Sequence, residues 1–216
     1  MKATTIAILG IILISFLIGI YIYPQMPEQM ASHWGAQGEV NGYASRFVGL
    51  FLMPIVSVFM LLLFIILPKI DPLKKNIKKF RGYYEKFILI IIAFLFYIYI
   101  LSLAWNLNYR FNMISMMVPA LGLLFYYAGI LTENAKRNWF IGIKTPWTLS
   151  SEIVWVKTHK LGGKMFKASG IISLLGLFFP KYAIWFVLVP VLFTAIYTFI
   201  YSYIEYQKLK KKKLRR

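Results

Sequence analysis

FILIIIAFLFYIYILSLAW, residues 87–105, is a run without a single charged side chain. About 20 such residues make a helix long enough to cross a bilayer, because each residue adds about 1.5 Å and the hydrocarbon core is about 30 Å thick. The whole chain has the same character, since 60% of its 216 residues are hydrophobic and its mean hydropathy is +0.67. One soluble core could not bury that much apolar surface. The composition therefore predicts an integral membrane protein.

Five further apolar runs extend this prediction to an all-α membrane protein with six transmembrane helices. With 87–105, the predicted spans are 4–23, 47–67, 113–131, 165–179 and 182–204. The run 165–179 is short for a span, at about 22 Å, and we expect it to gain length from flanking residues. The first run is longer than the apolar part of a signal peptide and lacks a small-residue cleavage site, so it is interpreted as a retained helix.

The positive charges indicate which side each loop occupies. Of the 25 Lys and Arg residues, only Arg46, Arg110 and Lys181 fall in one set of alternate loops, and the other 22 fall on the opposite side. Cytoplasmic loops are enriched in Lys and Arg, which predicts that both termini are cytoplasmic. Tryptophan prefers membrane interfaces, and none of the six falls at the middle of a predicted span. Trp147 and Trp155, on the inner side, are interpreted as interfacial anchors.

The chain divides into three parts. Residues 1–67 form a helix pair with an outer loop, 68–86 a basic cytoplasmic connector, and 87–216 the remaining helices with a basic tail at 205–216. The tail is interpreted as an anchor on anionic lipid rather than a nucleic-acid-binding segment, because its charge follows the membrane topology.

Catalytic chemistry is not indicated. The chain has no cysteine, and its two histidines, His33 and His159, fall on opposite sides of the predicted membrane. No metalloprotease, nucleophile-elbow or phosphate-loop motif occurs, so we expect neither an enzyme nor a bound cofactor or metal. No ionisable residue lies well inside a predicted span, which disfavours an ion-coupled transporter.

Two polar segments interrupt the apolar sequence. The outer loop, PQMPEQMASHWGAQGEVNGYASR at 24–46, has two prolines that favour extended backbone. Gly35, Gly38 and the Asn41-Gly42 pair are turn-forming residues, and an Asn-Gly pair is a good turn signal. We expect it to be compact.

The inner segment, NWFIGIKTPWTLSSEIVWVKTHKLGG at 138–163, begins as an apolar–polar alternation. Ser150 is placed as an N-cap, and the predicted helix runs from 151 to about 161, ending at Gly162-Gly163. Lys157 and the lysines after it recur at three- and four-residue steps, so they form one stripe if the helix continues. Such a stripe is attracted to anionic headgroups.

These two segments resemble known motifs. The inner segment, with signature bounds 138–164, is similar to the signature of the SdpI family of bacterial immunity and signal-transduction membrane proteins. The outer loop is similar to the motif that often accompanies it. Two positions depart from the family pattern, Lys144 in place of Arg and Asn41 in place of Asp.

The resemblance implies two groups of functional residues. The cytoplasmic group is Asn138, Gly142, Lys144, Thr145, Pro146, Trp147, Thr148, Ser151, Trp155, Thr158, His159 and Gly162. The outer group is Pro24, Pro27, His33, Trp34, Gly38, Asn41, Tyr43 and Arg46.

The resemblance also implies a function. Members that resemble the founding protein of the family protect a cell from its own secreted peptide toxin, and they hold a cytoplasmic repressor at the membrane when toxin is present. By that resemblance the outer loop would sense toxin and the inner segment would pass on the signal. The alternative from another class is a small-molecule or peptide exporter.

The charge asymmetry generates a topology prediction. Reporter fusions after residues 75, 150 and 216 should report the cytoplasm, and a fusion within 30–40 should report the outside. Paired cytoplasmic and periplasmic reporters at each site make the measurement. An outside signal at 150 would contradict six spans.

Overall fold

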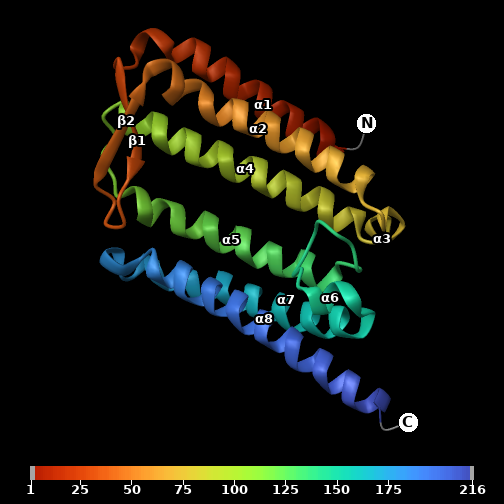
Figure 1. The fold of residues 1–216 in the computed structure, drawn as a ribbon. Coiled ribbons are helices and arrows are strands. Elements are labelled where there is room, and N and C mark those ends of the chain that lie inside the picture. Colours follow the sequence, from red (N-terminus) through yellow and green to blue (C-terminus); the bar gives the residue numbers. More distant parts are fainter. Residues whose placement is uncertain (1–2, 215–216) are drawn as a thin grey trace.

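A computed structural model gives the fold, and it describes residues 3–214. Long helices dominate it, joined by short segments and a single two-stranded hairpin (Figure 1). The α-helices and strands, in chain order, are α1 Ala3–Ile22, β1 Gln29–Trp34, β2 Val40–Ser45, α2 Arg46–Ile70, α3 Lys74–Lys78, α4 Arg81–Asn106, α5 Met113–Asn134, α6 Pro146–Ser150, α7 Glu152–Ser173 and α8 Trp185–Leu214. Short 3₁₀ turns lie at Tyr23–Gln25, Leu174–Leu177 and Pro180–Tyr182.

The expectation of an all-α membrane protein is confirmed. Within residues 3–214, five helical segments are long and apolar enough to cross a membrane: Ala3–Gln25, Arg46–Ile70, Arg81–Asn106, Met113–Asn134 and Pro180–Lys212. Each contains one of the predicted spans. The sixth predicted span, 165–179, falls in the second half of α7 and the turn after it. The count of six spans therefore stays a prediction.

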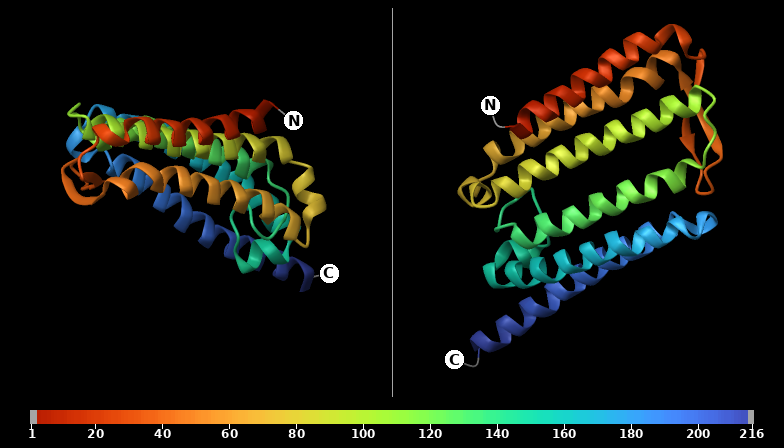
Figure 2. Two further views of the ribbon diagram at one scale, coloured as in Figure 1. Left: turned by 90° about the horizontal axis from the view of Figure 1, so that it is seen from above. Right: turned by 180° about the vertical axis from the view of Figure 1, so that it is seen from behind.

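The long helices form two groups of three, which we call the N-terminal half (α1, α2 and α4) and the C-terminal half (α5, α7 and α8). α1, α2 and α4 pack together, as do α5, α7 and α8, and α4 and α5 are in contact between them (Figure 2). The β hairpin and the α4–α5 connection lie at one end of the molecule. Both ends of the described chain, α3 and the segment between α5 and α7 lie at the other (Figure 1). We refer to these as the hairpin end and the inner end.

The hairpin turns at Gly35 and Gly38, two of the turn-forming positions in the sequence, and not at the third. Its strands are joined at 35–39, where the Gly35 amide donates to Glu39 O and Gly38 takes a positive φ of +88°. The prediction of a turn at Asn41-Gly42 was wrong, because both residues lie inside β2. Gly42 instead allows a close cross-strand approach, since a Cβ there would lie 2.9 Å from His33 Cβ beside a β-bulge.

Glycines allow the backbones of α5 and α7 to approach closely, because a larger residue at these positions would collide with the facing helix. A Cβ on Gly129 would lie 2.5 Å from Gly163 O, and one on Gly170 would lie 2.5 Å from Gly122 O. The glycines recur every seven residues on both helices, so they face each other two turns apart. Small residues at such positions let two backbones touch, as is common between membrane helices.

The same contact explains an error in the predicted helix end. Gly162-Gly163 was expected to terminate a helix near 161, but α7 runs without a break from Glu152 to Ser173. These glycines lie inside the helix because they face neighbouring elements, Gly163 against α5 and Gly162 against Ile143 and Thr198. These two positions therefore require glycine because of close packing, and not because a helix ends there.

Enlarging this contact should destabilise the protein. Gly129→Ala places a methyl group against the α7 backbone, so we expect the free energy of unfolding to fall by about 1–3 kcal/mol. Gly10→Ala is the matched control, because a Cβ at Gly10 of α1 meets nothing within 4 Å. Unfolding of both variants in detergent measures the difference. Equal stability of the two would contradict the contact.

Candidate functional site

The loop between α5 and α6, residues 135–145, is folded around the side chain of Asn138. We call it the inner loop. Asn138 is fully buried, and its Nδ2 donates to Lys136 O and Ile141 O, each at 2.8 Å. Its Oδ1 accepts from the amides of Phe140 at 2.9 Å and Ile141 at 2.6 Å. One amide side chain thus satisfies four backbone groups that a buried loop would otherwise leave unpaired.

His159 of α7 closes the same loop from the other side. Its Nδ1 lies 2.8 Å from Trp155 O, and its Nε2 lies 3.0 Å from the Ile143 amide nitrogen. A carbonyl can only accept and an amide N–H can only donate, so Nδ1 carries the proton and Nε2 accepts. These two partners fix the neutral ring in one tautomer. Protonating Nε2 would break the bond to the loop.

Burial favours the same protonation state. His159 is 1% exposed, and desolvation lowers its pKa to about 4. Its ring stacks on Trp155 at 3.8 Å between centroids, and Trp155 Nε1 donates to Ala135 O at 2.8 Å. His159 and Trp155 therefore act together as a buried support for the loop.

Gly142 is required by this arrangement. Its φ of +113° is strained for other residues, and a Cβ would collide with His159 Nε2. The sequence placed Gly142 at the centre of an extended alternation. The structure has an irregular turn there instead, because the chain wraps around Asn138.

The next residues attach the loop to α8. Thr145 is the N-cap of α6 in a capping box with Thr148, and its Oγ1 lies 3.0 Å from Ser202 Oγ of α8. Thr148 Oγ1 also donates to Ile143 O at 2.9 Å. Both threonines are buried, and a buried hydroxyl needs a hydrogen-bond partner, which these bonds supply.

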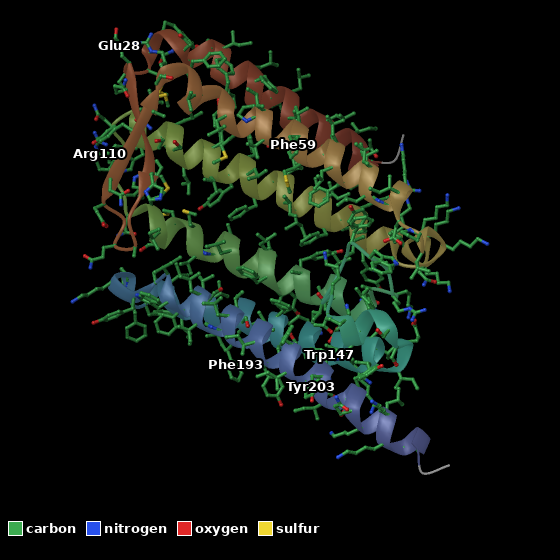
Figure 3. The ribbon with its side chains drawn as sticks, viewed as in Figure 1. Glu28, Phe59, Arg110, Trp147, Phe193 and Tyr203 are labelled. Carbon is green, nitrogen blue, oxygen red and sulfur yellow. The ribbon has the colours of Figure 1, made fainter. Side chains whose placement is uncertain are left out.

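The two central tryptophans are not alike. Trp147 packs edge-on against Phe199 and Tyr203 of α8, each at 5.1 Å between centroids (Figure 3). Trp155 is fully buried. The expectation that both anchor the chain at the membrane interface was therefore wrong for Trp155, whose indole N–H is used inside the protein.

The remaining predicted residues lie in the inner loop, in α6 and in the first turns of α7. Ser151, not Ser150, is the N-cap, and its side chain accepts from the Val154 amide at 3.4 Å. Ser150 Oγ instead donates to Pro146 O at 2.6 Å within α6. Thr158 is fully buried, and its hydroxyl has no hydrogen-bond partner in the structure. Lys144 is exposed.

The lysine stripe on α7 forms, because the helix continues through the glycines. Two of its members are ion-paired within the protein: Lys157 with Glu205 at 2.6 Å, and Lys167 with Glu133 at 2.7 Å. Lys160 and Lys164 are exposed. The Glu205 pair links α7 to α8, and the Glu133 pair links α7 to α5.

Sequence reasoning missed the residues that connect this loop to the N-terminal half. Asp71, 2% exposed, accepts from the amides of Trp139 at 2.9 Å and Leu73 at 2.6 Å. Asn76 Nδ2 donates to Arg137 O at 2.9 Å. The sequence shows Asp71-Pro72 only as a pair near the start of the basic connector 68–86, which does not indicate a distant partner.

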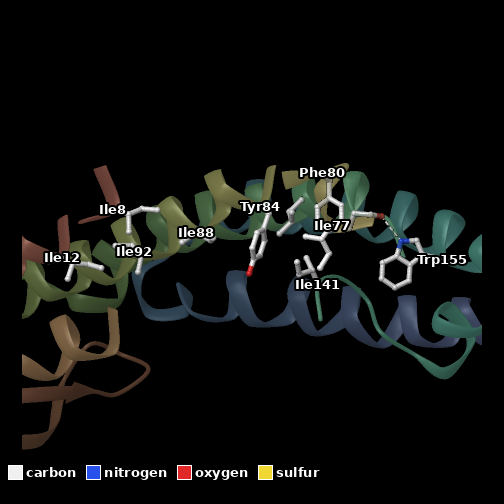
Figure 4. Packing of buried hydrophobic residues seen from close by; sticks show 11 residues of the cluster. Ile8, Ile12, Ile77, Phe80, Tyr84, Ile88, Ile92, Ile141 and Trp155 are labelled. Carbon is white, nitrogen blue, oxygen red and sulfur yellow. Dashed lines mark hydrogen bonds between the residues drawn. The ribbon is translucent and has the colours of Figure 1, made fainter. Parts of the chain in front are cut away.

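Apolar packing reinforces this connection. Buried residues of α1, α3 and α4, with Phe80 between α3 and α4, form one cluster with Ile141 and Trp155 (Figure 4). Ile77 and Tyr84 are among them. The inner loop is therefore part of the core that joins the two halves.

The outer loop joins the same halves at the hairpin end. Asn106, at the end of α4, pairs with both backbone groups of Ala31 in β1, at 2.8 Å and 3.0 Å. Asn112, the N-cap of α5, donates to Gln37 O at 2.7 Å. Sequence reasoning missed both asparagines.

The predicted residues of the outer loop take several positions. His33 and Asn41 are hydrogen-bonded across the strands. Trp34 packs edge-on against Trp105 at 5.9 Å. Arg46 donates to Pro27 O at 3.4 Å and lies over the ring of Tyr23. Pro24 is exposed in the turn before the hairpin, Gly38 turns it, and Tyr43 is 63% exposed.

Burial of His159 predicts a pH dependence of stability. Its pKa is about 6.5 in an unfolded chain and about 4 in the fold. The unfolded state therefore binds more protons between these values, and stability falls as pH falls from about 6.5 to about 4. At about 1.4 kcal/mol per pKa unit the loss is about 3 kcal/mol.

Unfolding of the wild type and His159→Gln in detergent, at several pH values between 7.5 and 4, measures this effect. Glutamine does not titrate, so the stability advantage of the wild type should narrow as pH falls. A constant difference would show that His159 does not gain a proton on unfolding.

Both polar segments fall in regions that are similar to known proteins. The model for "Domain of unknown function (DUF1648)" matches residues 10–58, and the model for the SdpI/YfhL protein family matches residues 134–202. The chain is 28% identical to Immunity protein SdpI of Bacillus subtilis (strain 168) over 210 residues, which cover 97% of this chain and 98% of that protein. No solved structure matches. The expected resemblance is thus confirmed: residues 134–202 match the model for the SdpI/YfhL protein family, and residues 10–58 before them match the DUF1648 model.

Proposed function

We propose that this chain is a membrane immunity protein that protects the cell from a secreted antimicrobial peptide. The observation that carries the proposal is the match to Immunity protein SdpI, which runs almost end to end through both chains. It includes the hairpin and the inner loop, so the proposal draws on both ends of the molecule.

The hairpin offers a surface suited to such a peptide. Tyr43 on β2 is 63% exposed, and Tyr109, in the α4–α5 connection at the same end of the molecule, is 69% exposed. Glu28 and Glu39 are also exposed there. Exposed aromatic rings bind apolar side chains and cations, and carboxylates attract cationic groups. An amphipathic peptide with positive charge fits this chemistry.

The way the hairpin is attached supports a role in sensing. Asn106 and Asn112 fix it to α4 and α5, which belong to different halves. A ligand on the hairpin that prefers one spacing of these helices would shift the protein toward that arrangement, by its differential affinity for the two. The inner loop joins the same halves through Asp71, so the shift would reach it.

At the inner end, we propose that the exposed cations present a docking surface for a cytoplasmic repressor. Lys144, Lys160 and Lys164 are exposed there. Complementary charge guides association and selects partners. In this proposal Asn138 and His159 hold the loop in shape and take no part in catalysis.

The alternative, an exporter, draws on one observation. An apolar cavity of about 340 Å³ lies between the halves, lined by residues such as Phe64, Phe87, Phe125 and Phe166 and by the loop at 140–143. A small apolar substrate would fit that lining. Energy-dependent efflux from vesicles that contain the purified protein would favour this alternative over immunity.

The proposal predicts that the hairpin determines resistance. Expression in a sensitive bacterium should raise survival under a panel of membrane-active peptides, and Tyr43→Ala should reduce that protection at least severalfold. Tyr21→Ala is the matched control, because Tyr21 is 77% exposed on α1 outside the hairpin. Membrane levels of each variant are measured by immunoblot. Equal protection by both variants would exclude Tyr43 as a contact, and no protection by the wild type against any peptide would contradict the immunity function.

A further inference from the structure

We propose that the inner end of the N-terminal half contains a binding site for one anionic phospholipid. The site is a groove formed by α1, α2, α3 and α4, with an apolar interior and a mouth of positive charge. This is distinct from the general attraction of the basic tail to the membrane, because the groove would hold a single lipid with a defined headgroup.

The groove has the size of a ligand site. Its volume is about 580 Å³, which lies within the range of about 300–1,000 Å³ typical of small-molecule pockets. Its floor is buried and apolar, made by Ile8, Ile77, Tyr84 and Ile88. The one polar atom of this floor, Tyr84 Oη, already donates to Phe64 O at 3.0 Å. The interior therefore suits an acyl chain.

The walls open toward the membrane. α1 and α2 are two of the candidate spans, and they contribute Leu9 and Ile65, which are 45% and 44% exposed. A molecule that enters between them comes from the bilayer, where acyl chains are the available apolar groups. A cytoplasmic peptide would instead have to pass the charged mouth.

The mouth carries a surplus of positive charge. Lys69 lies in the last turn of α2, and Lys74 and Lys78 lie on α3. All three line the groove and are exposed. Arg81 also lines it and is paired with Glu85 at 2.6 Å, so the three lysines supply the surplus. Thr4 and Thr5 of α1 add hydroxyl groups to the lining.

Position and charge together favour an anionic phospholipid. Basic pockets between membrane helices bind anionic headgroups, and each Lys or Arg near an anionic surface contributes about 1 kcal/mol. A phosphate at the mouth would lie next to the lysines while one acyl chain extends along α1 and α2 into the bilayer. A zwitterionic lipid would gain less, because its own cation offsets the phosphate.

Native mass spectrometry of the full chain tests the site. The protein is purified in detergent with equal amounts of phosphatidylglycerol and phosphatidylcholine, and the lipids that remain bound are counted. We expect one retained phosphatidylglycerol per chain. The double variant Lys74→Gln/Lys78→Gln should reduce this retention about tenfold or more, from the loss of two cations.

Two further variants separate the site from general effects. Lys211→Gln/Lys212→Gln removes the same charge from the tail and should leave retention unchanged. Leu9→Trp should reduce retention by filling the groove, although it keeps every lysine. An equal effect of both double variants would reduce the groove to diffuse electrostatics. Failure of the wild type to prefer phosphatidylglycerol, or of Leu9→Trp to lower retention, would overturn the proposal.

None of these outcomes depends on the immunity proposal, because lipid retention is measured without toxin. Soluble glycerol phosphate serves as a competitor. If it displaced the bound lipid, the lysines alone would form the site and the acyl groove would be excluded.

Discussion

The contact between α5 and α7 is the constraint on which the rest of the structure depends. Four glycines, at 122, 129, 163 and 170, bring the two backbones together over two turns. Without a hydrophobic driving force between membrane helices, such close packing is one of the few sources of association energy. It fixes the depth and rotation of α7, so that Trp155 and His159 meet the end of α5 and the loop after it.

The inner loop follows from that placement. A loop buried between helices must satisfy its backbone without water, and here Asn138, His159 and Thr148 do so with bonds of normal length. These side chains are buried polar groups whose bonds all end within the protein. Their residue types are therefore explained by structure, and the exposed residues beside them are the ones left for a partner.

Much of the fold could be predicted from the sequence, because apolar runs identify helices well at this length. Five of the predicted spans lie in helices that can cross a membrane. The errors arose where one residue type serves two purposes. Gly162-Gly163 and Asn41-Gly42 have the composition of a helix end and a turn, but both pairs lie within regular elements, where glycine permits close approach. Local sequence does not contain the neighbouring helix that makes the difference.

The site was predicted in part. The resemblance identified Asn138, Gly142 and His159, yet no periodicity could show that they meet around one loop. Asp71, Asn106 and Asn112 were missed because their partners are backbone groups more than 60 residues away for Asp71 and 75 for the two asparagines. A backbone partner has no residue type, so no sequence pattern records it.

Those three residues have a consequence for how the chain is assembled from parts. The two regions that match family models, 10–58 and 134–202, lie in different halves. Asp71, Asn106 and Asn112 lie outside both matched regions. The stretch between the matched regions thus holds residues that bind their backbones, Asp71 at the inner end and Asn106 and Asn112 at the hairpin end. In a hybrid that exchanged one of the matched regions alone, Asp71, Asn106 and Asn112 would stay, but some of the backbone groups that they bind would come from another protein. We therefore expect the compatibility of the two regions to depend on the 59–133 segment and on the loops that it binds.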